Sequence, residues 1–183
     1  IWPFSGMKNE LLEGGLRIPS IVRWPGRIPA GRISDQVMIS MDWLPTLLAA
    51  AGGSPDPAYP SDGINLLPHL ASNVPAISRK LFWRYKAGGQ RAVREGDMKY
   101  LRIAGNEFLF NITEDPRERA NLKDRQSALF ERLRADWEAW EKTMLPERTR
   151  PAGFTNSGNF MADHYGVPVK PAAAAPKPSA STP

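Results

Sequence analysis

Apolar residues recur at two different periods along the chain, and each period predicts a different kind of element. From Ser127 onward the spacing is three or four residues, which is the repeat of an amphipathic helix. The apolar positions of this stretch are Phe130, Leu133, Trp137, Trp140 and Met144. Opposite charges four residues apart, such as Arg132 and Asp136, lie on the other face and support the helix. The pattern predicts a helix whose aromatic stripe contacts a core.

Four short apolar segments precede this helix, separated by gaps that contain glycine. The segments are residues 80–85, 90–94, 98–103 and 107–112. Gaps this short favour antiparallel hairpins. The sequence therefore predicts a small α+β subdomain, in which a four-stranded antiparallel sheet is packed by the C-terminal helix.

The first part of the chain alternates between strand-like and helix-like patterns. Residues 18–24 and 37–40 are strand-like apolar segments, and residues 43–51 read as a helix that ends at two glycines. Asp42 is placed to cap that helix. This alternation is typical of an α/β domain, and an apolar run such as 18–24 needs cover on both faces if it belongs to a mostly parallel sheet.

These patterns divide the chain into three regions. Residues 1–72 are predicted to be an α/β segment, and residues 73–145 the sheet-and-helix subdomain. Residues 146–183 form a tail rich in proline and alanine. A segment of that composition buries too little apolar surface to offset its ordering entropy, so we expect disorder at its end.

One lysine stands in a pattern that chemistry could use. Lys8 lies between Gly6 and the sequence Glu13-Gly14-Gly15. A lysine ammonium is a compact charge with three donors, which suits a tetrahedral oxyanion such as sulfate or phosphate. The two adjacent glycines offer backbone freedom, including positive φ, where a side chain would block the close approach of a ligand or a neighbouring loop. The pattern predicts an anion site on a loop, with Glu13 holding that loop or pairing with Arg17.

The same stretch resembles the sulfatase family, in the part that reads Gly6 to Pro19. Further motifs follow in the order that the family uses: Trp24-Pro25-Gly26, Asp42-Trp43-Leu44-Pro45-Thr46, Asp62-Gly63, Leu81-Phe82-Trp83-Arg84, Gln90-Arg91-Ala92-Val93-Arg94, and Asp115-Pro116-Arg117-Glu118 with Asn121-Leu122. The resemblance is to the C-terminal portion of such an enzyme, of the arylsulfatase or N-acetylgalactosamine-6-sulfatase type, within the alkaline phosphatase superfold. The nucleophile motif of the family, Cys or Ser followed by Pro and Arg at alternate positions, does not occur in the sequence.

The resemblance implies a mechanism for the complete enzyme. It would hydrolyse sulfate monoesters with a formylglycine made from an upstream Cys or Ser, and calcium would be bound by upstream residues and not by this chain. Lys8 is the one site residue that carries over, and the resemblance implies that it binds the sulfate and stabilises charge on the leaving oxygen. The implied partners are the sulfate-ester substrate and the missing N-terminal catalytic part, without which we expect no activity.

Composition narrows the remaining classes of function. The net charge of +5 comes from 24 Lys and Arg against 19 Asp and Glu, but the basic residues are scattered, which argues against nucleic-acid binding. The absence of cysteine excludes disulfides and thiolate metal sites from the chain. No apolar run reaches the ~20 residues of a membrane span.

The sequence alone decides neither the cellular compartment of the complete protein nor the reaction that it catalyses. The chain opens on Ile1-Trp2 without a signal-peptide pattern, while the resemblance implies a periplasmic or secreted location for the complete protein. His69 and His164 have no metal-ligand spacing. Two alternatives to a sulfatase remain: a phosphoesterase or phosphonate hydrolase of the same superfold, and a non-catalytic interaction module.

Overall fold

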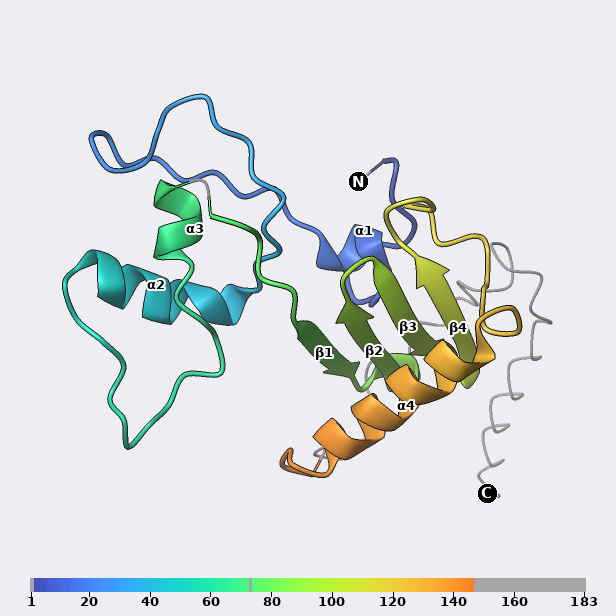
Figure 1. The fold of residues 1–183 in the computed structure, drawn as a ribbon. Coiled ribbons are helices and arrows are strands. Elements are labelled where there is room, and N and C mark those ends of the chain that lie inside the picture. The colour runs from blue at the N-terminus through green and yellow to red at the C-terminus, as the bar shows by residue number, and fades with distance from the viewer. Residues whose placement is uncertain (1, 73, 147–183) are drawn as a thin grey trace, which may run out of the picture. The chain divides into compact units, whose positions relative to one another are not determined.

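The computed structural model describes residues 2–72 and 74–146 and divides them between two compact units (Figure 1). The first unit joins the N-terminal residues up to Arg17 to the chain from Lys80 onward, and the second is Ile18–Arg79. The predicted division of the chain into residues 1–72, 73–145 and 146–183 stays a prediction. The predicted disordered end lies outside the described residues.

A four-stranded antiparallel sheet forms the centre of the first unit. Its strands are β1 (Lys80–Tyr85), β2 (Gln90–Glu95), β3 (Met98–Ile103) and β4 (Asn106–Asn111), and they lie in chain order (Figure 1). A short turn at Ala87–Gly89 links β1 to β2, and Ala104 and Gly105 link β3 to β4 with φ of 49° and 82°. Such left-handed pairs match the twist of a tight hairpin. The predicted sheet is confirmed, with strand limits within one residue of those expected.

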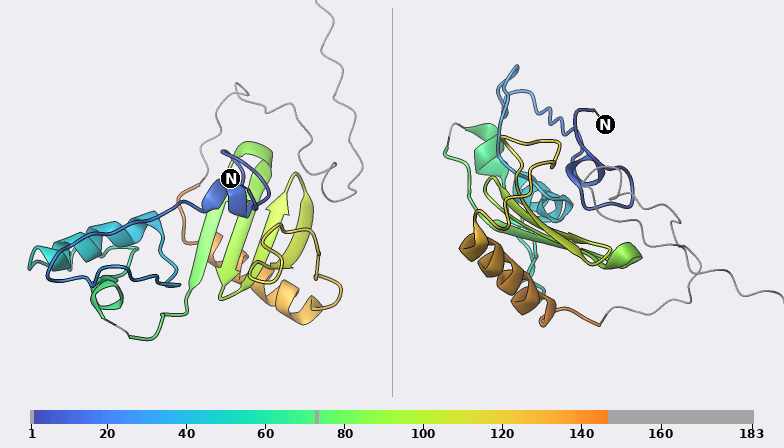
Figure 2. Two further views of the ribbon diagram at one scale, coloured as in Figure 1. Left: turned by 90° about the horizontal axis from the view of Figure 1, so that it is seen from above. Right: turned by 90° about the vertical axis from the view of Figure 1, so that its right-hand side faces the viewer.

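The helix α4 (Ser127–Glu141) packs on one face of this sheet, as predicted (Figure 2). Leu133 and Trp137 are buried with Val93 and Tyr100 of the sheet. The Trp137 indole N–H donates to the Trp83 carbonyl at 2.9 Å. The helix ends before Met144, which the periodic pattern had included.

The N-terminal residues cover the opposite face of the sheet. Leu11 and Leu12 are buried there with Leu101 and Phe110, just before the short helix α1 (Glu13–Leu16). Figure 2 shows α1 and α4 on opposite sides of the strands. Side chains alternate between the two faces of a strand, so β2, β3 and β4 supply apolar residues to both cores. The sequence had suggested one covering element, and the structure has two.

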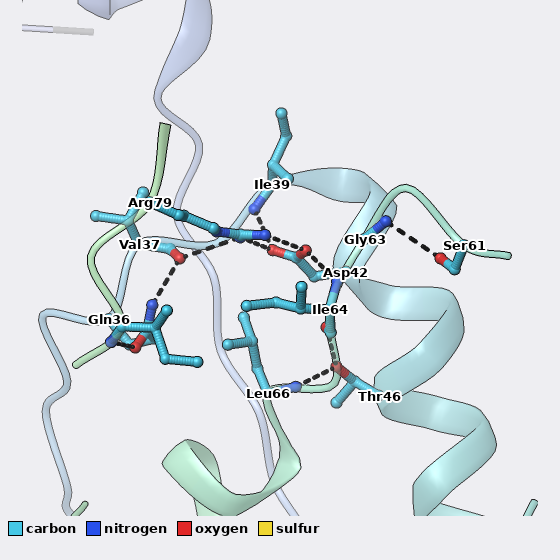
Figure 3. A network of polar contacts seen from close by, with 11 residues as sticks. Gln36, Val37, Ile39, Asp42, Thr46, Ser61, Gly63, Ile64, Leu66 and Arg79 are labelled. Carbon is cyan, nitrogen blue, oxygen red and sulfur yellow. Dashed lines mark hydrogen bonds and ion pairs between the residues drawn. The ribbon is translucent and has the colours of Figure 1, made fainter. Parts of the chain in front are cut away.

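The second unit is built around a buried carboxylate. It contains a short turn (Ser40–Asp42), α2 (Trp43–Ala50) and α3 (Leu67–Ala71). The Asp42 carboxylate accepts the backbone N–H groups of Ile39 and Ile64 at 2.8 and 3.0 Å and pairs with the Arg79 guanidinium (Figure 3). Asp42 precedes α2 as expected, but its side chain bonds these groups and does not cap α2. The cap prediction is wrong for that reason.

The two strands expected in this unit do not form. Residues 18–24 and 37–39 are irregular, and Ser40 begins the short turn that precedes α2. Ile18 and Ile21 are 79% and 93% exposed. A strand needs a neighbour for its backbone N–H and C=O groups, and no described residue pairs with either segment. In the ranges 2–72 and 74–146, no helix has the length and apolarity that crossing a bilayer requires.

Candidate functional site

Lys8 lies at the exposed tip of a tight turn in the first unit. The Glu10 N–H donates to the Met7 carbonyl at 3.1 Å, and one Glu10 carboxylate oxygen accepts the Met7 N–H at 2.9 Å. Gly6 and Asn9, on either side of Lys8, have left-handed φ of 85° and 77°. Glycine and asparagine are the residues that adopt this conformation most readily. The backbone therefore presents a lysine at a defined place.

Two glycines let this turn pack directly on α1. A Cβ atom on Gly14 would lie 2.5 Å from the carbonyl oxygens of Ser5 and Gly6, and one on Gly15 would lie 2.1 Å from the carbonyl oxygen of Glu10. The Gly14 N–H donates to the Ser5 carbonyl at 2.7 Å. The predicted need for close approach by a neighbouring loop is confirmed. The predicted positive φ is wrong for these two residues, since it occurs at Gly6 and Asn9 instead.

A buried cluster of charges ties α1 to the sheet. The Glu13 carboxylate accepts from Arg17 Nε at 2.5 Å and from Lys99 Nζ at 2.8 Å, which confirms the predicted pairing with Arg17. Lys99 also donates to Glu118 at 2.8 Å, and the second oxygen of Glu118 accepts the Glu13 N–H at 2.7 Å. Lys99 and Glu118 have no solvent exposure. The two carboxylates are balanced by the two cations.

The pKa values of the two carboxyl groups move in opposite directions. Burial raises the pKa of Glu118, and the hydrogen bonds from Lys99 and the Glu13 N–H offset it only in part. Burial also opposes the charge of Glu13, but Lys99 and Arg17 together outweigh it and lower the pKa of Glu13. Glu13 is therefore held as a carboxylate with its acceptors occupied, a state suited to structure rather than to proton abstraction.

A second set of contacts joins the Lys8 turn to the sheet through neutral groups. The Gln90 side chain accepts the Leu11 N–H at 2.8 Å and donates to the Asn9 carbonyl at 2.8 Å. The Tyr85 hydroxyl donates to the Asn9 side-chain oxygen at 3.2 Å. The turn that carries Lys8 is thus bonded to β1 and β2 immediately after the lysine.

Arg84, Arg91 and Arg94, which the sequence offered as possible anion ligands, have other partners in the structure. Arg84 donates to Glu141 at 2.9 Å, and Arg91 lies 4.4 Å from the centroid of the Trp137 ring, both on the α4 side. Arg94 donates to the Gly96 carbonyl at 2.9 Å. His69 lies in α3, in the other unit, and His164 lies outside the described residues. None of these contacts of Arg84, Arg91 and Arg94 involves Lys8.

The described residues supply no metal site. No group of three or more His, Cys, Asp or Glu side chains within residues 2–72 and 74–146 is arranged to hold an ion.

The sequence analysis did not predict the residues that bond α1 and the Lys8 turn to the rest of the unit, namely Lys99, Glu118 and Gln90. Lys99 stands in an apolar strand, where a lysine is usually solvated, and nothing in the local pattern marks it as buried. Gln90 and Glu118 stand within the motifs that resemble the sulfatase family, and that position was the one available signal. Their partners are far away in the chain, so the spacing of residues could not reveal the contacts.

Comparison with known proteins gives partial but consistent matches. No family model matches the chain. The chain is 40% identical over 97 residues to N-acetylgalactosamine-6-sulfatase of Canis lupus familiaris, covering 53% of this chain and 18% of the relative. It is 27% identical over 178 residues to an uncharacterized sulfatase of Schizosaccharomyces pombe, covering 90% of this chain and 30% of that relative.

A solved structure agrees with these matches. The crystal structure of Ps i-CgsB superposes with a TM-score of 0.68 and 27% sequence identity, over 76% of this chain and 32% of that one. The chain therefore spans about a third, or less, of the length of these three proteins.

Proposed function

We propose that this chain, a sulfatase homologue over part of its length, belongs to a larger sulfuric ester hydrolase in which Lys8 contacts the sulfate group. The observation that carries the proposal is the Lys8 turn. An exposed lysine is held by two left-handed residues, by glycine packing and by buried contacts with the sheet. Such a turn fixes the backbone from which the lysine side chain projects.

The chemistry of Lys8 suits a sulfate ester. Among the described residues no carboxylate forms an ion pair with its ammonium, which is therefore available to an external anion. An ammonium donates charge-assisted hydrogen bonds, which are stronger than neutral ones. As the bond between sulfur and the leaving oxygen lengthens, negative charge grows on that oxygen, and a donor already in place stabilises it without reorganisation. We assign this role to Lys8.

The remaining chemistry belongs to residues upstream of this chain. In the proposed enzyme, an upstream Cys or Ser converted to formylglycine provides the nucleophile, and calcium is bound by upstream carboxylates and amides. Lys8 then binds the sulfate oxygens and the leaving oxygen, while Gln90 holds the turn from which it projects. The chain by itself is expected to turn over no sulfate ester.

The substrate is proposed to be a sugar sulfate or an aryl sulfate. The relative from Canis lupus familiaris is an N-acetylgalactosamine-6-sulfatase, which makes a sulfated sugar the first class to assay. A phosphoesterase of the same superfold would use the same lysine on a phosphate ester, because both esters present tetrahedral oxyanions. The two chemistries are separated by substrate and not by fold.

The longer protein that contains this chain should be assayed on 4-nitrophenyl sulfate, 4-nitrophenyl phosphate and N-acetylgalactosamine 6-sulfate. We expect kcat/KM to be higher for a sulfate ester than for the phosphate. Higher kcat/KM on the phosphate would favour the phosphoesterase, and turnover of none of the three would favour a non-catalytic module. The purified chain, assayed alongside, serves as the inactive control.

A further inference from the structure

One buried amide of the sheet bonds to the backbone on the C-terminal side of Lys8. Gln90 is the first residue of β2 and is 6% exposed. Its side-chain oxygen accepts the Leu11 N–H at 2.8 Å, and its side-chain nitrogen donates to the carbonyls of Asn9 at 2.8 Å and Ala87 at 3.0 Å. Both hydrogens of the amide nitrogen and one lone pair of the oxygen are therefore in use.

Loss of the Gln90 hydrogen bonds is expected to destabilise the local structure. When a buried amide or backbone group loses its hydrogen-bond partner, the free energy of unfolding falls by more than the hydrogen bond had contributed to it. The orientation of Gln90 is therefore fixed by three backbone groups, and the positions of Asn9 and Leu11 are fixed in turn. Tyr85 adds a contact to the side chain of Asn9 at 3.2 Å.

Asn9 is the residue through which this arrangement acts on Lys8. It follows Lys8 directly and has a left-handed φ of 77°. A residue other than glycine adopts this conformation only at some cost, so the surrounding contacts have to maintain it. If Asn9 moved to an extended conformation, the peptide between Lys8 and Asn9 would turn and the base of the lysine side chain would move with it.

We propose that Gln90 is a positioning residue for Lys8. It does not touch the anion; it fixes the Asn9 and Leu11 backbone, so that the flexible lysine side chain starts from one place. The inference rests on the proposed role of Lys8 in sulfate-ester hydrolysis. A small displacement of a catalytic group can reduce the rate by tenfold or more, which makes the effect measurable.

The Glu13, Lys99 and Glu118 cluster acts at a different point. It includes Glu13, the first residue of α1, and it pairs with the Arg17 side chain, further along the chain from Lys8. Loss of that cluster would leave buried charges without partners and threaten the fold. Gln90 is neutral and contacts the residue next to Lys8. A substitution of Gln90 therefore tests the positioning of Lys8 without leaving a buried charge unpaired.

The test is a double-mutant cycle in the longer protein, read as kcat/KM on 4-nitrophenyl sulfate. Gln90→Met keeps a side chain of similar length and removes the hydrogen bonds. With Lys8 present, we expect Gln90→Met to lower kcat/KM about tenfold. In the Lys8→Ala background, we expect the same substitution to cost less than about twofold, because the group that it positions is already gone.

Tyr100→Phe is the matched control. Tyr100 lies on the α4 side of the same sheet, and its hydroxyl donates to Glu107 at 2.7 Å. This variant also removes one hydrogen bond from the sheet, but not one that reaches the Lys8 turn. We expect it to leave kcat/KM unchanged in both backgrounds.

The outcomes separate this inference from the proposed function. An equal loss from Gln90→Met in both backgrounds, or no loss in either, overturns the positioning role of Gln90 while leaving Lys8 in the site. A Lys8→Ala variant with parental activity overturns the proposed function and the inference together.

A variant that fails to fold does not block the test. If Gln90→Met does not fold, Tyr85→Phe replaces it, since that change removes only the hydroxyl that bonds Asn9. With Lys8 present, we expect a loss of about twofold to threefold from Tyr85→Phe, and none in the Lys8→Ala background. Equal activity of Tyr85→Phe and the parent with Lys8 present would then contradict the inference.

Discussion

The two units differ in what holds them together. The unit that contains the sheet buries apolar side chains on both faces, such as Leu101 on one and Leu109 on the other. The Ile18–Arg79 unit buries Asp42 and Thr46, while several of its apolar residues are exposed. The exposed fractions of Ile21, Ile33 and Leu47 are 93%, 92% and 59%. The first unit is stabilised mainly by an apolar core, and the second depends on a network of hydrogen bonds and one ion pair.

The two units also differ in how far each one covers its own apolar side chains. Exposed apolar residues in such numbers are typical of a surface that packs against other residues. The sheet unit has its own two cores, whereas the described residues of Ile18–Arg79 leave several apolar side chains exposed. We therefore expect the sheet unit to be destabilised most by truncation of its buried apolar side chains. We expect the Ile18–Arg79 unit to be destabilised most by loss of the charged Asp42 side chain.

The largest expected effect comes from deleting residues 1–17. A chain without these residues still contains all four strands and α4. Leu11 and Leu12 cover one face of the sheet, so their removal exposes that core and leaves Lys99 and Glu118 without Glu13. We expect the truncated chain to lose cooperative urea unfolding, measured by tryptophan fluorescence. A transition with the parental midpoint would show that this face needs no cover.

Replacement of Asp42 should give the next largest effect. Asp42→Ala leaves the Arg79 guanidinium and the N–H groups of Ile39 and Ile64 without their acceptor. Breaking a buried pair in this way costs about 3–5 kcal/mol. We expect protection from amide hydrogen exchange to fall in Ile18–Arg79, with little change in the sheet. Equal loss in both units would contradict the separation of their stabilities.

The same carboxylate predicts a dependence on pH. Burial alone would raise the pKa of Asp42, but the hydrogen bonds from Arg79, Ile39 and Ile64 outweigh it and lower the pKa. Its contribution to stability is therefore complete above the ordinary aspartate pKa of about 3.9, and it is lost as the pH falls through the lowered value. The protection factors of amide groups in Ile18–Arg79, corrected for the intrinsic exchange rate at each pH, should fall over that range in the parent, and Asp42→Ala should remove this part of the change.

A smaller effect is expected from a single apolar truncation in the sheet unit. Leu12 is 1% exposed, and Leu12→Ala should lower the free energy of unfolding by about 2–5 kcal/mol. Leu47→Ala is the matched control in the other unit, because Leu47 is 59% exposed and its truncation should change stability by no more than about 0.5 kcal/mol. Urea unfolding measures both. Similar losses at the two positions would end the contrast between the units.

Local patterns were enough to predict the sheet and α4. The hairpins follow from short glycine-containing gaps, and α4 follows from an apolar spacing of three and four residues. Both signals lie within a few residues of the chain. The cover on the second face of the sheet could not be found in this way, since Leu12 and Leu101 are far apart in the sequence.

The sequence selected one residue of the candidate site, Lys8, and its role stays a prediction. Lys8 was selected because its motif resembles a family, and the pairing of Glu13 with Arg17 follows from their spacing on a helical turn. The contacts with Lys99 and Gln90 needed the folded chain, because each joins α1 or its preceding turn to a strand more than seventy residues away. Apolar segments 18–24 and 37–40 were misread as strands because β pairing depends on a neighbour that the segment itself does not reveal.

The central claim is that Lys8 stabilises the leaving oxygen of a sulfate ester. The most direct test is whether the loss of kcat/KM caused by Lys8→Ala depends on the leaving group of the ester. Lys8→Ala in the longer protein should lower kcat/KM on 4-nitrophenyl sulfate by about 10²-fold, as for one preorganised donor. On phenyl sulfate, whose leaving oxygen carries more charge, the loss should be greater. A loss of the same size on both esters would contradict a role at the leaving oxygen, and parental activity on both would remove Lys8 from the site.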